Sequence, residues 1–314
     1  MSRPLAPVLA AAVLVLPAVT RGAEPLDLDL SRLGAPDARV WEARGATAAD
    51  AQALANDAKI RFGILSSELA LALSSAILEP AGTTGHSGFD VGLEGAYVGV
   101  HPTVVGTGAT AADDWPTSGM TPHELFLPSV HVRKALPYSF EVGGRMIYLS
   151  QSSYFAGQLE GKWALNEGFD LLPDVAVRFA WTQLFGQRDW NLGVGDVDFM
   201  VSKRWGVGAV ASLTPYAAAR YTFVRASTDV IQYGPAGTSP TDAMTTAAAF
   251  PTLSAGYYRT TAGLRLTALA VSMAAEATYF GGTTTGKANP TASQYPSYRL
   301  KSSWGAAWKL GFEF

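Results

Sequence analysis

Apolar and polar side chains alternate along the last part of the chain. One parity is apolar except at Ser302, whereas the other carries small, polar and charged residues. The apolar parity comprises Tyr298, Leu300, Trp304, Ala306, Trp308, Leu310, Phe312 and Phe314. Successive side chains of a β-strand point to opposite faces of the sheet. The pattern therefore predicts a strand over 298–314 with one apolar face, longer than the usual strand of about 5–6 residues.

The same two-residue period recurs upstream and predicts a series of strands. The predicted strands span 89–97, 126–133, 140–148, 155–163, 175–182, 197–202, 219–223, 258–267, 271–279 and 298–314. Ten is an even number, as found in bacterial transmembrane barrels. The stretch 190–215 is ambiguous, so eight or twelve strands stay open. We predict an all-β fold, an up-and-down antiparallel transmembrane β-barrel of about ten strands, preceded by an amphipathic helix.

The predicted connections between the strands differ in length. The long ones span 101–124, 228–251 and 281–297, and all three fall on one side of the predicted barrel. Bacterial transmembrane barrels have long extracellular loops and short periplasmic turns. This pattern places the long connections outside the cell and predicts that both ends of the mature chain lie in the periplasm.

The final strand also resembles the C-terminal signal of bacterial outer-membrane β-barrels, which the barrel-assembly machinery reads. The residues that carry this resemblance are Trp308, Leu310, Phe312 and Phe314. Short blocks at 173–178 and 186–189 are similar to uncharacterised outer-membrane barrels of deltaproteobacterial type. The resemblance implies a protein of the outer membrane of a Gram-negative bacterium. Its implied partners are membrane lipid and the assembly machinery, and it implies no established activity.

The region before the barrel divides into three predicted segments. Residues 1–22 have one early positive charge, a short apolar run and small residues at the end, as in a secretory signal peptide. The apolar run is too short for a membrane anchor. We expect a periplasmic linker over 23–46, a helix over 47–80 and the barrel over 88–314.

Apolar residues at three- and four-residue spacing predict the helix, which begins at a capping-box-like pair, Thr47 and Asp50. Its apolar stripe comprises Leu54, Ala58, Phe62, Leu65, Leu69, Leu73 and Ile77. The stripe must be covered, and three placements are open: inside the barrel, on the inner leaflet of the outer membrane, or in the periplasm against itself or a partner. A helix is about 10–12 Å across, and side chains already fill an eight-stranded barrel. We therefore expect the helix outside the barrel, as a periplasmic element.

Charged residues collect on the inward parity of the predicted strands. They are Glu94, Glu141, Arg145, Glu160, Lys162, Arg178, Asp198, Arg220, Arg265, Glu276 and Lys309. An Arg or Lys that faces lipid at the membrane midplane costs about 2–4 kcal/mol, so these residues must face an enclosed interior. They can line a narrow polar conduit that selects solutes, or form a salt-bridged core that fills the barrel. We favour the salt-bridged core.

Composition limits the chemistry of the protein. Charged residues make up 16% of the chain, the net charge is −3, and cysteine is absent. These values give no support for nucleic-acid binding, which requires a basic face, and they exclude disulfides and thiol nucleophiles. The sequence has no nucleophile elbow, zinc-protease motif or phosphate loop. We predict no cofactor, no metal site and no enzymatic activity.

Three functions stay open at this point. The first is a narrow channel or uptake path, whose partner is a small-molecule solute. The second is a closed structural or adhesive barrel that acts through its extracellular loops. The third, a loop-borne hydrolase, rests on four residues of the first long connection, and simple solvation of an exposed loop explains them better. These are His101, Asp113, Asp114 and His123. The sequence indicates no oligomeric state.

Overall fold

The structure is a computed structural model of the chain. It describes residues 24–85, 88–107, 111–119, 121–169, 171–208, 210–233, 246–285 and 294–314. The predicted signal peptide, residues 1–22, lies outside the described residues, and its assignment stays a prediction.

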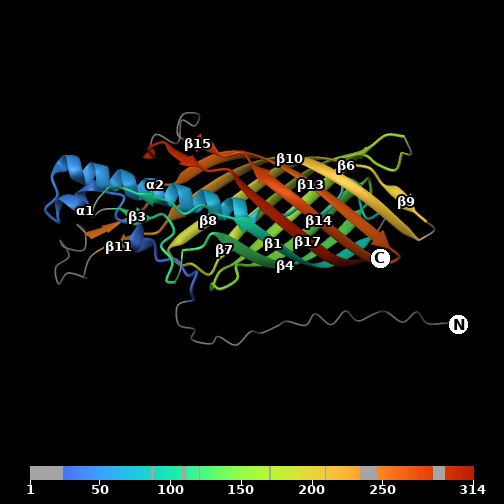
Figure 1. The fold of residues 1–314 in the computed structure, drawn as a ribbon, viewed down its shortest axis with the longest axis horizontal. Helices are drawn as coiled ribbons and strands as arrows, with labels where there is room; N and C mark the ends of the chain where they lie inside the picture. Colours follow the sequence, from blue (N-terminus) through green and yellow to red (C-terminus); the bar gives the residue numbers. More distant parts are fainter. Residues whose placement is uncertain are drawn as a thin grey trace.

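Ten long strands form one closed antiparallel barrel (Figure 1). They are β1 (Phe89–Gly99), β4 (Glu124–Leu136), β5 (Phe140–Tyr148), β6 (Phe155–Asn166), β7 (Asp174–Phe185), β8 (Trp190–Ser202), β10 (Ala211–Thr228), β13 (Leu253–Ala268), β14 (Val271–Phe280) and β17 (Ser303–Glu313). Each strand pairs with the next, and β1 closes the barrel by pairing with β17, where Val91 lies opposite Phe312. The short β9 (Trp205–Val207) pairs only with the start of β10. The predicted ten-stranded up-and-down barrel is confirmed.

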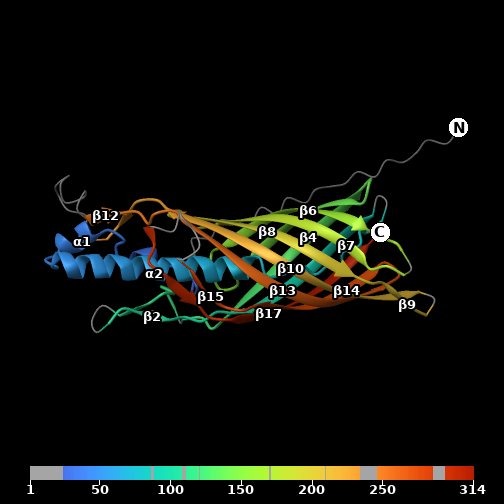
Figure 2. The same ribbon diagram turned by 90° about the horizontal axis from the view of Figure 1, so that it is seen from above.

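The long connections build a folded cap at one end of the barrel (Figures 1 and 2). We define the cap as the described residues of 24–60, 100–123, 229–252 and 281–302. Its short elements are η1 (Leu30–Leu33), α1 (Ala38–Glu42) and the strand pairs β2 (Val104–Val105) with β3 (Ala112–Asp113), β11 (Ile231–Gln232) with β12 (Ala247–Ala248), and β15 (Thr283–Thr285) with β16 (Tyr298–Leu300). The connections after β4, β6, β8 and β13 and the C-terminus lie at the opposite end, which we call the turn end, whereas the short connections after β5 and β7 lie at the cap end.

The predicted final strand is divided into two. Lys301 and Ser302 interrupt it, so Tyr298–Leu300 joins β15 in the cap and only Ser303–Glu313 enters the barrel. Tyr298 and Leu300 are buried, although their parity predicts contact with lipid. The prediction of one strand over 298–314 is wrong because the polar Ser302 marks a break between two sheets.

The two faces of each barrel strand differ sharply. On β17, Leu310 is 46% exposed on the outside, whereas its neighbour Lys309 is 3% exposed on the inside. Large apolar residues are exposed on the outer face of the other strands in the same way, for example Leu93, Leu159 and Phe179. An apolar outer face around a charged, enclosed interior is the arrangement that a membrane-spanning barrel requires.

Helix α2 (Ala48–Leu73) begins as the sequence predicts and ends earlier. The Thr47 hydroxyl accepts a hydrogen bond from the amide of Asp50 and donates one to its carboxylate. The helix was expected to continue toward residue 80, but it stops at Leu73 because wall residues bind its last carbonyl groups, as described below. Among the described residues, no helix is both long and apolar enough to cross a membrane.

The position of α2 differs from the expected one. The helix enters the barrel from the cap (Figure 2), and every residue from Arg61 to Leu73 is buried. A helix that is buried on all sides requires walls on all sides. The expectation of a helix outside the barrel is therefore wrong.

Small side chains make room for α2 inside only ten strands. The wall around its buried part includes Ala96, Ala156, Ala226 and Ala255, which belong to the same apolar cluster as the helix. On the helix itself, a Cβ atom at Gly63 would lie 2.6 Å from the ring of Tyr298. The argument from helix diameter failed because it assumed a wall of ordinary side chains.

The chain after α2 continues through the barrel to the other end. Residues 74–85 contact inward side chains of the wall, and Phe89 then pairs with Phe314 by hydrogen bonds in both directions. The start of the described chain lies in the cap, where the amide of Leu26 donates to the carbonyl of Gln151. The described chain thus begins at one end of the barrel and finishes at the other, which contradicts the expectation of both ends on one side.

Candidate functional site

The interior of the barrel has two parts that we treat separately. In the half nearer the cap, which we call the cap half, α2 packs against apolar walls. The other half, which we call the turn half, holds the non-helical residues 74–85. These residues, which we call the lumen segment, pass between charged side chains of the strands. The turn half holds the charged residues that the sequence singles out.

Glu79 of the lumen segment is the centre of one ion cluster. Its carboxylate pairs with Arg133, with Lys162 at 2.8 Å and with Arg178 at 3.2 Å. Lys162 and Arg133 also pair with Glu141, at 3.0 and 3.4 Å. All of these side chains are almost completely buried, so three cations from three strands hold one carboxylate of the lumen segment.

A second cluster lies on the wall around His131. Its Nδ1 is 2.9 Å from Glu94 and its Nε2 is 2.8 Å from Glu160. Arg145 pairs with Glu94 at 2.7 Å, and Arg178 pairs with Glu160. Because Arg178 pairs with both Glu160 and Glu79, it joins the His131 cluster to the Glu79 cluster, and it also bonds Asp198 at 2.6 Å.

Two arginines of the wall bind the end of α2 and the residue after it. Arg259 donates to the carbonyls of Leu71 and Ser74 at 2.9 and 3.1 Å, and Arg220 donates to the same Ser74 carbonyl. Asp196 and Asp198 on β8 pair with Arg259 and Arg220, respectively. The last carbonyl groups of a helix lack partners within the helix. The guanidinium groups supply those partners and a favourable charge, which ends α2 at this level.

Arg145 extends this pattern into the lumen segment. Its guanidinium donates to the carbonyls of Ala76 and Ile77 at 2.8 and 3.2 Å. The wall thus contacts the backbone of the segment as well as its Glu79 side chain.

Acceptors on the wall bind the amide groups of the lumen segment. Glu276 accepts from Ile77 and Leu78 at 2.6 and 2.7 Å, and from the Tyr216 hydroxyl at 2.7 Å. The backbone of Leu78 has a φ of 58°, which is unusual for a residue with a side chain. Glu276 fixes this bend by binding two successive amide groups.

The segment is bound further toward the turn end as well. Ser202 accepts a hydrogen bond from the amide of Ala81 at 3.1 Å, and Glu167 accepts one from the amide of Thr83 at 2.8 Å. Lys162 donates to the carbonyl of Gly82 at 3.1 Å.

A last group of charges lies near the start of β1. Asp90 pairs with Lys309 at 2.5 Å, Arg133 at 3.1 Å and Arg265 at 3.3 Å. Arg265 also pairs with Glu313 at 2.5 Å. Strands β1, β4, β13 and β17 are thereby joined across the lumen at this end.

The structure buries the side chains of all eleven residues of the predicted inward set. They are Glu94, Glu141, Arg145, Glu160, Lys162, Arg178, Asp198, Arg220, Arg265, Glu276 and Lys309. Ten of them form ion pairs, and Glu276 binds backbone amides instead. Their role, as a conduit lining or as a filled core, is taken up below.

Sequence reasoning missed several members of these clusters. They are Glu79, Asp90, His131, Arg133, Asp196 and Arg259. All except Glu79 lie on inward-facing strand positions, so parity alone could have included them. Glu79 was missed because it was assigned to the helix, where strand parity does not apply.

The cap half is held by apolar and aromatic contacts. Phe62 of α2 is fully buried and stacks on Phe250 with ring centroids 4.5 Å apart, and Trp190 lies 6.2 Å from it. The hydroxyl of Ser67, one of the few polar groups here, lies 2.6 Å from the Tyr257 hydroxyl. Apolar packing therefore holds α2 in the cap half of the barrel.

The residues proposed for a loop-borne hydrolase divide into two groups. Asp113 and His123 are exposed, whereas Asp114 is fully buried, so solvation does not explain Asp114. Its Oδ1 accepts from the amide of Thr103 at 2.9 Å, and Oδ2 has no hydrogen-bond partner in the part of the chain that the structure describes. Burial, together with the nearby carboxylate of Glu68, raises the pKa of Asp114 to about 7.

Glu68 ties this connection to the helix. Its carboxylate accepts from the Trp115 indole at 2.8 Å and from the amide of His101 at 3.2 Å. Burial and the positive charge of Lys301 lower the pKa of His101, which favours a neutral imidazole there. Within the described residues, no group of three or more His, Asp or Glu side chains is arranged to hold a metal ion.

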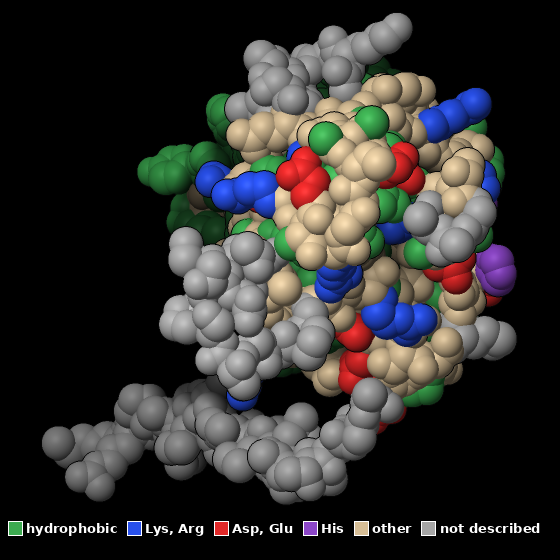
Figure 3. All heavy atoms as spheres, turned by 90° about the vertical axis from the view of Figure 1, so that its left-hand side faces the viewer, with side chains coloured by type: hydrophobic (Ala, Val, Ile, Leu, Met, Phe, Trp, Pro, Cys, Tyr) green, Lys and Arg blue, Asp and Glu red, His purple; other side chains and the backbone are tan. Residues whose placement is uncertain are grey.

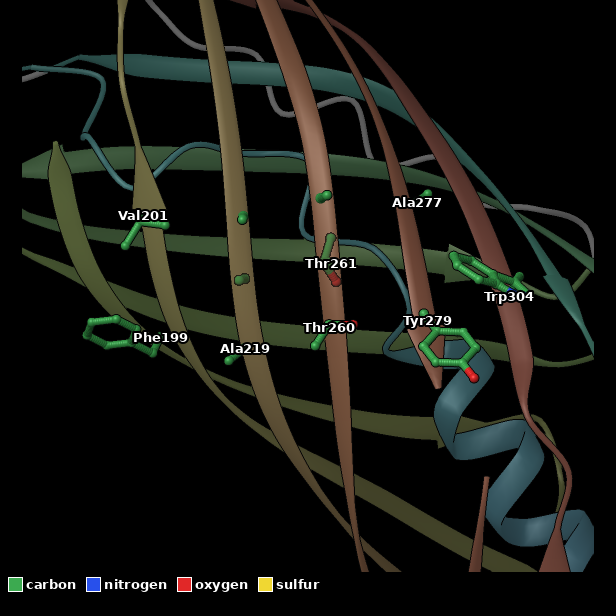
Figure 4. A pocket seen from close by; sticks show the side chains of 11 residues that line it. Phe199, Val201, Ala219, Thr260, Thr261, Ala277, Tyr279 and Trp304 are labelled. Carbon is green, nitrogen blue, oxygen red and sulfur yellow. The ribbon is translucent and has the colours of Figure 1, made fainter. Parts of the chain in front are cut away.

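A hollow of about 600 Å³ lies on the outer face of β8, β10, β13 and β14, beside β17 (Figure 4). Small outward residues such as Ala219 and Ala277 form its floor, with Phe199 on one side and Tyr279 and Trp304 on the other. No charged side chain lines it. It is a depression in the apolar surface and offers no group for catalysis.

The remaining predicted residues lie on the outer face of β17. Trp308, Leu310, Phe312 and Phe314 are exposed there. Their assignment as an assembly signal rests on the resemblance alone and stays a prediction.

Comparisons with known proteins show no family. No family model and no curated protein matches the sequence. Among solved structures, the N-terminal β-barrel domain of Pseudomonas aeruginosa OprF is 12% identical and covers 73% of this chain and 99% of its own, with a TM-score of 0.27. Neisserial surface protein A is also 12% identical, covering 72% and 95%, with a TM-score of 0.28.

A third similar structure is the outer membrane protein OprG of Pseudomonas aeruginosa. It is 8% identical and covers 75% of this chain and 99% of its own, with a TM-score of 0.29. At these identities and TM-scores no role is transferred to this protein. The similarity to deltaproteobacterial barrels is not among these findings and stays a prediction.

Proposed function

We propose that this protein is an outer-membrane β-barrel that is closed along its axis and acts through its cap. In this proposal the turn end and the C-terminus face the periplasm, and the cap faces the cell exterior. Lipid contacts the apolar outer face, and the assembly machinery reads the last strand. The filled lumen is the observation that supports a closed barrel over a channel.

The inward charged residues are occupied by the groups that fill the lumen, which argues against a role in conduction. A polar conduit needs charged groups that face water and bind a passing solute weakly enough to release it. Here the inward charges are paired with each other or with the lumen segment, and almost all are buried. Breaking one buried pair costs about 3–5 kcal/mol, so passage of a solute would have to break several such pairs.

In the proposed orientation, the cap is the part of the protein that meets molecules outside the cell. Viewed end-on, acidic and basic side chains are scattered over it and do not gather into one patch (Figure 3). This distribution fits a structural or adhesive role through several loops better than attraction of one strongly charged partner.

Planar-bilayer recording tests the proposal directly. The full chain, shown to be folded by heat-dependent gel mobility, should give no stable single-channel steps. Steady steps from folded wild-type protein would contradict a closed barrel and restore the channel hypothesis. In that case, replacing Arg178 or Arg265 with Ala should change the ion selectivity.

A further inference from the structure

We propose that the barrel carries the N-terminal segment of its own chain across the outer membrane and holds it, folded, at the cell surface. The inference rests on the orientation proposed above, with the cap outside. It contradicts the expectation that residues 23–46 form a periplasmic linker. It also adds a function to the barrel, the transport of its own N-terminal segment to the cell surface, which we call self-export.

The path of the chain carries the inference. Strand β1 begins at the turn end, where Phe89 pairs with Phe314. Before that point the chain lies inside the lumen: Thr83 is bound by Glu167 at the turn end, Ile77 by Glu276 farther in, and Ser74 by Arg259 where α2 ends. The chain ahead of β1 can therefore reach the cap only along the axis of the barrel.

The part of this N-terminal segment that lies in the cap, residues 24–33, is held by many contacts. Leu28, Leu30 and Leu33 are buried in the main apolar cluster, and Arg61 of α2 donates to the carbonyl of Leu33 at 2.8 Å. The Asp27 carboxylate accepts from the amide of Ser153 at 2.7 Å, in the connection between β5 and β6. Residues 24–33 thus hold loops of the barrel together and form part of the folded cap.

The wall of the barrel is built to hold this segment. Without it, Arg220 would keep Asp198, Arg259 would keep Asp196 and the Thr222 hydroxyl, and Glu276 would keep the Tyr216 hydroxyl. The three cations around Glu79 would also lose their shared carboxylate. Each of these buried charges would lose a partner, and such losses are costly, so the empty barrel is less stable than the threaded one.

The threaded path has a functional consequence. Any sequence that is placed directly ahead of Glu24 starts in the cap. The protein should therefore display such a sequence on the cell surface without any change to the strands.

Single-cysteine variants test the inference, since the chain has no cysteine of its own. Three exposed positions form a matched set: Ala49 in the first turn of α2, Val230 in a long connection, and Leu171 in a short turn. Whole cells that express Ala49→Cys, Val230→Cys or Leu171→Cys are treated with a membrane-impermeant maleimide. Heat-dependent gel mobility confirms folding of each variant.

We expect Ala49→Cys and Val230→Cys to react at similar rates in intact cells, and Leu171→Cys to react only after permeabilisation. Labelling of Val230→Cys without labelling of Ala49→Cys would overturn self-export but keep the proposed orientation. Labelling of Leu171→Cys without the other two would overturn the orientation itself. The two failures are therefore distinguishable.

A second experiment tests transport of added sequence. A short unstructured epitope is inserted between Ala23 and Glu24, and intact cells are treated with antibody and then with protease. Surface staining that protease removes is the expected result. An epitope that becomes accessible only in permeabilised cells, on a barrel that has folded, would contradict the inference.

Discussion

Helix α2 and the lumen segment fill the same barrel, the first with apolar contacts and the second with ion pairs and hydrogen bonds. The difference follows from the backbone of each filling. A helix satisfies most of its own amide and carbonyl groups, so its wall needs only to be apolar and well packed. The lumen segment has no such internal bonds, and the wall must supply the partners.

The wall residues follow this requirement closely. Around α2 the wall carries alanines, Leu192, Val194 and Tyr257. Around the lumen segment it carries Arg145, Glu276 and other groups that donate or accept. The polarity of a barrel interior can therefore report the conformation of the chain that fills it, independently of any flow of solute.

The largest effect is expected in the turn half, from Glu79→Ala. This change removes the one carboxylate that pairs with all three of Arg133, Lys162 and Arg178, and removing one partner from such a buried group costs about 3–5 kcal/mol. Urea unfolding of the protein in lipid vesicles, followed by gel mobility, measures the loss. The exposed Glu42→Ala is the matched control. Equal costs for the two variants would show that the ion cluster does not hold the segment.

A somewhat smaller loss is expected in the cap half, from Leu69→Ala. Leu69 is fully buried on α2, and truncation of a buried leucine costs about 2–5 kcal/mol, depending on how far the walls collapse. The same unfolding measurement applies, with the exposed Val104→Ala as control. Bilayer recording sharpens the comparison, because this variant should stay closed while the lumen segment remains bound. Single-channel steps from the folded variant would mean that α2 alone blocks the barrel.

The strands were predictable because the pattern that predicts them lies in neighbouring residues of the sequence. Alternating parity depends only on the two-residue period of a strand, and it correctly predicted that β17 turns Lys309 inward and Leu310 outward. It failed at Tyr298 and Leu300, which keep the parity but belong to another sheet. The two-residue period shows which side of a strand is apolar. It does not show whether lipid or another part of the protein covers that side, because this depends on the tertiary structure.

The filling of the barrel was not predictable in the same way. The stripe on the helix indicated a need for cover, but residues 61–73 are buried on every side, including Ser66 and Ser67. The burial of the polar Glu68 and Asp114 was equally hidden, since it depends on contact between α2 and a loop far along the chain. Such pairings leave no periodic signal in the sequence.

The rim of the cap half offers a pH-dependent test, because Asp114 is a carboxyl group in apolar surroundings. Its pKa is raised from 3.8 to about 7 in the folded protein. The neutral form is therefore favoured by folding: the stabilisation is complete below about pH 4 and is lost as the pH rises through about 7. The docking of residues 100–107 and 111–117 on α2 should weaken over this range.

Hydrogen exchange of this segment, corrected for intrinsic rates, measures the docking. Wild-type protein should show less protection at about pH 8 than at about pH 5, and Asp114→Asn should remove most of the difference. The exposed Asp113→Asn should behave as wild type. A pH dependence that survives in Asp114→Asn would assign it to another group, with Glu68 the nearest candidate.

The smallest effect is expected at the exposed start of α2, from Thr47→Ala. The change removes the hydroxyl that caps the amide of Asp50, and loss of such a cap costs about 1 kcal/mol. Because residues 48–60 bury only one side of the helix, the loss should appear as fraying of the first turn, seen as faster hydrogen exchange at residues 48–52. Thr47→Ser keeps the capping hydroxyl and should exchange as wild type does. If Thr47→Ala destabilised the whole protein as much as Leu69→Ala does, the two ends of α2 would be equally important, and packing inside the barrel would not be what holds the helix.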